Sequence, residues 1–200
     1  MKRAMAVFLV CTLCVLGNQL RAANLSDACG DDHAHFDVKT EKNAPAPAPP
    51  AAGKAQVVFI ERIDAPGCLG CYDFAPRIAV DGSWVGATKG DSYFVLDVAP
   101  GAHSVCADWK SLSAAHGKHI GVASFTAEPG QTYFFEAKIL AAPEGPSNPP
   151  SVRTRWVLVL SQLDNDKGED RMKNSALATS TPTTPTTPTT PSTPSTPTKQ

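Results

Sequence analysis

The chain has 200 residues, which is enough for one domain of ordinary size with tails and too few for a multidomain assembly. Apolar residues make up 42% and charged residues 18%, and 18 Lys and Arg against 19 Asp and Glu give a net charge of -1. This balance argues against a basic nucleic-acid-binding domain, so we expect no nucleic-acid partner.

Residues 1–23 are predicted to be a secretory signal peptide. Lys2 and Arg3 precede an apolar run over residues 4–17, which suits a signal sequence and falls short of the ~20 residues that span a bilayer as a helix. Ala22 and Ala23 offer small residues for cleavage. We therefore expect export to the periplasm or the cell exterior, with no membrane span after cleavage. An uncleaved N-terminal anchor is the alternative.

Residues 24–53 are predicted to form a polar arm and an Ala/Pro-rich linker. The arm holds Asp31, Asp32, His33 and His35 close to Cys29, and these residue types suit a divalent transition metal. Metal sites usually need three or four ligands held rigidly, and a polar arm before a proline-rich linker favours a solvated segment instead. His33 and His35 are thus weak metal candidates, and we expect no metal and no cofactor.

Residues 54–165 have the pattern of an all-β domain. Short apolar or alternating runs are bounded by turn residues, and Asp81-Gly82 between two such runs predicts a tight hairpin. The pattern predicts an antiparallel β-sandwich of seven to eight short strands with disordered Pro-rich flanks. The run over 156–160 is apolar on both faces, so we expect a central strand there. The candidate strands are 56–61, 77–80, 83–86, 92–98, 103–109, 121–127, 132–140 and 156–160.

The C-terminal part divides into two segments. Residues 166–179 are predicted to be a short helix or linker, because helix-like composition is confined to residues 164–174, with Asp164 or Asn165 as N-cap. Residues 180–200 are predicted to be a disordered tail rich in Thr, Pro and Ser. Its prolines recur at every third position, which matches the threefold turn of polyproline II, and its hydroxyls are candidate glycosylation sites.

Four cysteines remain after signal removal, and an even number in an exported chain favours disulfides. The candidates are Cys29, Cys68, Cys71 and Cys106. Spacing leaves three connectivities open; we favour a bridge from the 68–71 loop to Cys106, with Cys29 bonded to the other loop cysteine. The alternative is a redox or metal site at the CxxC. A redox centre gains its low thiol pKa from a helix N-terminus after a strand, whereas the flanking residues here indicate a loop.

Five short motifs occur at the predicted turns and strands: Val80-Asp81-Gly82, Val85-Gly86, Ser92-Tyr93-Phe94, Pro100-Gly101-Ala102-His103 and Gly130-Gln131-Thr132-Tyr133. Together they resemble an uncharacterised bacterial domain family of exported proteins and lipoproteins with a short β-sandwich. The match runs over roughly residues 54–165, and its hairpin and Pro-Gly turns are similar to those of PEGA-type repeats. The resemblance implies an envelope β-module and carries no activity or functional residues with it.

Aromatic residues on or near the strands and loops are the candidate ligand contacts. Trp84 follows the Asp81-Gly82 turn, and Tyr72 and Trp109 lie beside or within the loops over 63–76 and 110–119. Flat rings of this kind can bind sugars, although aromatic residues also pack in cores. No nucleophile motif accompanies the histidines, so we expect no enzyme.

These observations predict a noncatalytic exported module of the cell envelope, binding or structural, that contacts a glycan or another surface protein. The alternative is an extracytoplasmic redox or metal-binding protein that uses the CxxC and the Cys/His-containing N-terminal arm. A small enzyme whose site assembles from scattered residues is a third possibility.

Overall fold

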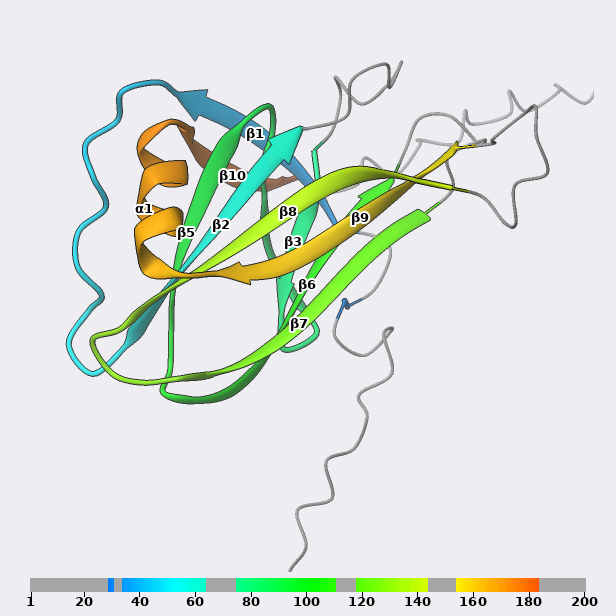
Figure 1. The fold of residues 1–200 in the computed structure, drawn as a ribbon. Helices are drawn as coiled ribbons and strands as arrows, with labels where there is room; N and C mark the ends of the chain where they lie inside the picture. Colours follow the sequence, from blue (N-terminus) through cyan, green and yellow to red (C-terminus); the bar gives the residue numbers. More distant parts are fainter. Residues whose placement is uncertain (1–28, 31–33, 64–74, 111–117, 144–153, 184–200) are drawn as a thin grey trace, which may run out of the picture.

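The computed structural model describes residues 29–30, 34–63, 75–110, 118–143 and 154–183. These residues form ten strands and one short helix (Figure 1), so the predicted all-β class is confirmed. The signal peptide over 1–23 and the tail beyond residue 183 lie outside the described residues. The elements are β1 (His35–Glu41), β2 (Ala55–Ile63), β3 (Arg77–Val80), β4 (Ser83–Ala87), β5 (Ser92–Val98), β6 (Gly101–Lys110), β7 (Lys118–Ala127), β8 (Thr132–Pro143), β9 (Thr154–Leu163), α1 (Asn165–Lys173) and β10 (Ala176–Thr183).

The strands form two sheets, one with the order β1-β10-β5-β2-β8-β9 and one with the order β4-β3-β6-β7. The four-stranded sheet is antiparallel throughout. In the six-stranded sheet, β2 pairs with β8 and β5 with β10 in parallel, so the expectation of an entirely antiparallel domain was wrong. All four strands of the other sheet lie between β2 and β8 in the chain, so no hairpin turn constrains β2 and β8 to run antiparallel.

Alternate residues of both sheets point into one shared core. Val57 and Phe59 of β2 and Phe135 of β8 contribute from the six-stranded sheet, while Val105 and Ala107 of β6 contribute from the other. All five are fully buried. This alternation follows from the two-residue period of a strand, which sends successive side chains to opposite faces.

The domain is larger at both ends than the sequence indicated. β1 lies in the segment assigned to the polar arm, and β10 spans the boundary between the expected helix or linker and the expected tail. The two strands pair with each other over seven residues. Their side chains are mostly exposed, so the alternating apolar pattern that revealed the other eight strands is weak in them.

The run over 156–160 was expected to be central, and this was wrong, because β9 is the last strand of the six-stranded sheet. Its apolar character has another cause: β7, the edge strand of the other sheet, lies directly against it (Figure 1). A Cβ on Gly121 of β7 would lie 2.8 Å from the backbone nitrogen of Leu160. The two edges therefore cover each other.

The helix α1 packs on the outer face of the six-stranded sheet. Asp164 is its N-cap and accepts a hydrogen bond from the Lys167 backbone N–H at 2.9 Å, as one of the two predicted caps. A Cβ on Gly168 would lie 2.2 Å from the Phe134 ring, so only glycine allows this approach. No helix in the described part of the chain is both long and apolar enough to cross a membrane.

Candidate functional site

A buried ion pair lies on the outer face of the four-stranded sheet. Arg77 begins β3 and Asp108 stands opposite it on β6, so their side chains share one face of the sheet. The Arg77 Nη2 group donates to Asp108 Oδ2, and Nη1 donates to the Ala34 carbonyl at 2.9 Å. The Arg77 guanidinium also lies 4.3 Å from the Trp84 ring centroid. Arg77 therefore joins β3, β4, β6 and the segment that leads into β1.

The second oxygen of this carboxylate, Asp108 Oδ1, is buried and has no hydrogen-bond partner among the described residues. It belongs to a residue that lines a cavity of about 220 Å³ between β1 and the adjoining ends of β3, β4 and β6. A buried acceptor without a donor is costly, and in native proteins such an atom calls for an explanation such as a ligand. The cavity is lined by His35, Phe36, Val38, Ala75, Arg77, Ala87 and Asp108.

A disulfide holds the N-terminal segment beside this site. Cys29 is bonded to Cys106, which precedes Asp108 by two residues on β6, and both cysteines are buried. The expected pairing of Cys106 with a cysteine of the 68–71 loop was therefore wrong. Sequence spacing could not show that residues 29–30 return to the outer face of β6. Cys68 and Cys71 lie outside the described residues.

The half-buried Trp84 helps to position the same segment. Gly30 has a φ of 66°, and a Cβ there would lie 2.6 Å from the Gly82 carbonyl oxygen and 3.1 Å from Trp84 Nε1. Arg77 lies over the ring. These contacts give Trp84 a structural role. Part of its ring is exposed to solvent, and contact of that part with a ligand stays a prediction.

The other predicted site residues have different outcomes. Trp109 is 3% exposed, belongs to the shared core and stacks on His119 with ring centroids 5.2 Å apart. It was therefore wrongly expected to offer a ring face to a ligand. Tyr72 and His33 lie outside the described residues, while His35 is exposed on β1 and lines the cavity. No cluster of three or more metal-ligating side chains occurs in the described ranges.

A second buried carboxyl lies on β2. Glu61 is 1% exposed and accepts a hydrogen bond from the Gly90 N–H at 2.9 Å, while its Oε2 has no hydrogen-bond partner in the described part of the chain. Burial raises the pKa of Glu61 to about 8, against the opposing effect of the Gly90 hydrogen bond. The carboxyl is therefore mostly protonated at neutral pH.

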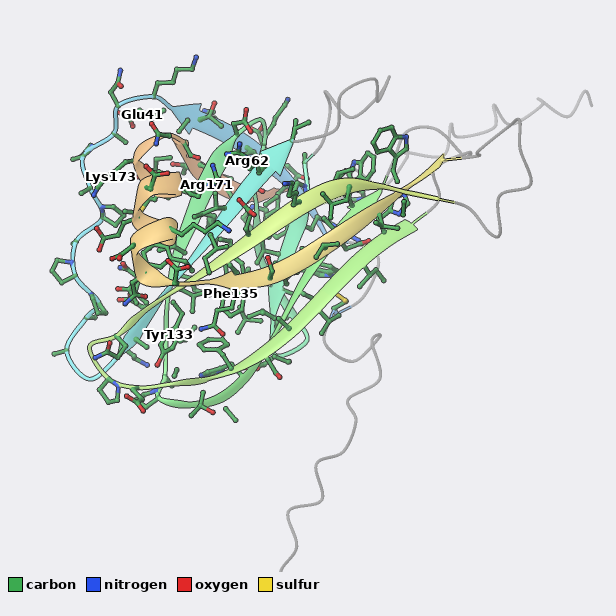
Figure 2. All side chains as sticks on the ribbon, viewed as in Figure 1. Glu41, Arg62, Tyr133, Phe135, Arg171 and Lys173 are labelled. Atoms are coloured by element: carbon green, nitrogen blue, oxygen red, sulfur yellow. A yellow bond between two sulfur atoms is a disulfide. The ribbon has the colours of Figure 1, made fainter. Side chains whose placement is uncertain are left out.

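A cavity of about 680 Å³ lies between the C-terminal end of α1 and the β1–β2 connection. Figure 2 shows Arg171 and Lys173 on α1 in this region, with Glu41 at the end of β1. The polar groups of the helix end are bonded within the helix: Lys173 pairs with Glu169, and the Asn174 side chain bonds the Asp170 carbonyl. The smaller cavity beside Asp108 is therefore the better candidate, because it retains an unmatched acceptor.

Sequence analysis missed Arg77, Asp108 and Glu61 as site residues. The available signal was a charged side chain within an otherwise apolar strand, since Asp108 stands between Ala107 and Trp109 and Glu61 ends a run of apolar residues. In comparisons with family models, curated proteins and solved structures, none matches this chain.

Proposed function

We propose that the chain is a noncatalytic exported module of the cell envelope whose cavity beside Asp108 binds a sugar unit of an envelope glycan. The observation that carries the proposal is the buried, unmatched Asp108 Oδ1 at a cavity of about 220 Å³. The volume is below the ~300–1,000 Å³ of typical small-molecule sites, so it suits one sugar ring at the end of a chain.

The cavity lining defines the chemistry of the ligand. Arg77 neutralises Asp108, so the pair favours no net charge on the ligand and leaves one carboxylate oxygen for a hydroxyl or amide donor. Phe36, Val38 and Ala87 supply apolar surface. An N-acetylated sugar combines these features, because its amide N–H and hydroxyls donate and its methyl group is apolar.

The disulfide supports the export part of the proposal. Structural disulfides persist in oxidising compartments outside the cytosol. The Cys29–Cys106 bond joins two residues that are 77 positions apart in the sequence. Two sheets around one core support a β-sandwich, and they suit the resemblance to the uncharacterised family of exported bacterial β-sandwich proteins. A periplasmic or extracellular location belongs to the same proposal.

The test is titration of the protein with an N-acetylglucosamine disaccharide, followed by saturation-transfer NMR and calorimetry. Val38→Phe fills the cavity from its β1 side, and we expect it to abolish binding. Val159→Phe enlarges an exposed valine on β9 and should leave binding intact. Asp108→Asn should weaken binding by about tenfold, since it replaces a charged acceptor by a neutral one. Binding that is unchanged in Val38→Phe, or no binding by the unaltered protein, contradicts the glycan proposal.

A further inference from the structure

The outer edge of β1 is an open edge of the six-stranded sheet. β1 is the first strand of that sheet and pairs with β10 on its inner side only. No described strand pairs with its other side, so half of its backbone N–H and C=O groups point away from the sheet. An unpaired edge of this kind is a template for a further strand.

The other edges of the two sheets are covered. β7 and β9 lie against each other, and the Ala87 N–H of β4 donates to Ser180 Oγ of β10 at 3.0 Å. Among the strands that the structure describes, β1 is therefore the one that offers a full edge of seven residues.

The charges along β1 are complementary to those of a second, antiparallel copy of β1. His35, Asp37, Lys39 and Glu41 alternate along one exposed face of the strand. When two copies run antiparallel with Val38 opposite Val38, Asp37 of each copy faces Lys39 of the other, and His35 faces Glu41. Each acidic side chain on this face then lies across from a lysine or a histidine of the other copy. Cross-strand pairs of opposite charge stabilise a sheet.

The alternation also selects this register over its neighbours. A shift that places Lys39 opposite Lys39 also places Asp37 opposite Glu41, and a shift in the other direction places Asp37 opposite Asp37. Like charges directly opposite each other are destabilising. Registers that differ by one residue pair opposite faces of the strand and are excluded by the pleat.

We propose that two copies of this chain associate through their β1 edges, in antiparallel register about Val38, to join their six-stranded sheets into one continuous sheet. The contact is isologous, because each copy presents the same surface to the other. Phe36 and Val38 stay half-buried against their own domain. The side-chain pairs across the contact are formed by the exposed residues of the other face, His35, Asp37, Lys39 and Glu41. The inference is independent of the proposed glycan binding.

The test is a charge swap measured by sedimentation equilibrium and light scattering, from low micromolar to several hundred micromolar protein. Because of the twofold axis, Lys39→Asp or Asp37→Lys alone creates two like-charge pairs. We expect each single variant to weaken dimerisation by at least about tenfold. The double variant Asp37→Lys/Lys39→Asp restores opposite pairs and should restore the affinity.

Lys54→Asp is the matched control, because it makes the same charge change at an exposed lysine outside β1 and should leave association unchanged. Asp37 and Lys39 are themselves exposed, so the single variants should unfold at the same temperature as the unaltered protein. A protein that stays monomeric throughout, single variants that associate normally, or a double variant that fails to recover would each overturn the proposal.

Discussion

Asp108 and Glu61 are both carboxyl groups removed from water, with exposed fractions of 0% and 1%, yet the fold accommodates them differently. Asp108 is paired with a guanidinium that is itself held by two further contacts. Glu61 receives one backbone N–H and has a pKa raised to about 8 by burial. A buried charge requires a partner, and a buried carboxyl without one keeps its proton instead.

The difference between these two groups also locates the site. Asp108 is paired with Arg77 and lines the cavity beside β1, so its unmatched oxygen can accept a hydrogen bond from a ligand. Glu61 on β2 accepts a hydrogen bond from Gly90 in the turn between β4 and β5, and it is a structural group that limits the pH range of the fold.

The largest effect is expected from Arg77→Met, because it leaves Asp108 as a buried charge without its cation. Breaking a buried pair in this way typically costs about 3–5 kcal/mol. Urea unfolding followed by tryptophan fluorescence measures the change. The double variant Arg77→Met/Asp108→Leu should recover most of the loss, since removal of both partners leaves no buried charge. A loss below about 1 kcal/mol in Arg77→Met would contradict the role of the pair.

Glu61→Gln should stabilise the protein at neutral and alkaline pH. The folded-state pKa of about 8 lies above the ordinary value of 4.5, so the folded protein holds a proton that the unfolded chain releases. Stability of the unaltered protein therefore falls as the pH rises from 4.5 to 8. At about 1.4 kcal/mol for each pKa unit, the variant should gain on the order of 4–5 kcal/mol over this interval.

Unfolding free energies measured at several pH values decide this prediction. Glu128→Gln is the control, because Glu128 is an exposed glutamate and its loss should leave the pH dependence unchanged. A Glu61→Gln variant that loses stability with rising pH as steeply as the unaltered protein would show that the Glu61 carboxyl is ionised in the fold.

The sequence predicted the β class, eight strands, the Asp81-Gly82 hairpin and the Asp164 cap, because each depends on local alternation or turn chemistry. It did not reveal β1 and β10, whose exposed side chains carry little apolar signal and which are stabilised by pairing with each other. It also could not place Cys29 on Cys106 or Asp108 beside Arg77. Those contacts depend on which strands become neighbours, and residue spacing does not encode that arrangement.

The smallest effect concerns His103, a third ionisable group, whose charged form is favoured by hydrogen bonds near the surface. Its Nδ1 lies 2.6 Å from Asp81 Oδ2 and its Nε2 lies 2.8 Å from the Ala99 carbonyl oxygen. Both partners are acceptors, so only the doubly protonated ring can donate to each of them. Burial lowers the pKa of His103, but the hydrogen bonds to Ala99 and Asp81 outweigh it, so the pKa is raised.

Since the folded-state pKa lies above the ordinary value of 6.5, this stabilisation is complete below that pH and is lost as the pH rises through the folded-state value. His103→Gln should therefore lower stability by about 1 kcal/mol in mild acid and by less in alkali. An NMR titration of the ring protons gives the pKa directly. A value below 6.5 would show that the ring is neutral and that Ala99 or Asp81 lacks its donor. The loss of stability between pH 4.5 and 8 would then be assigned to Glu61.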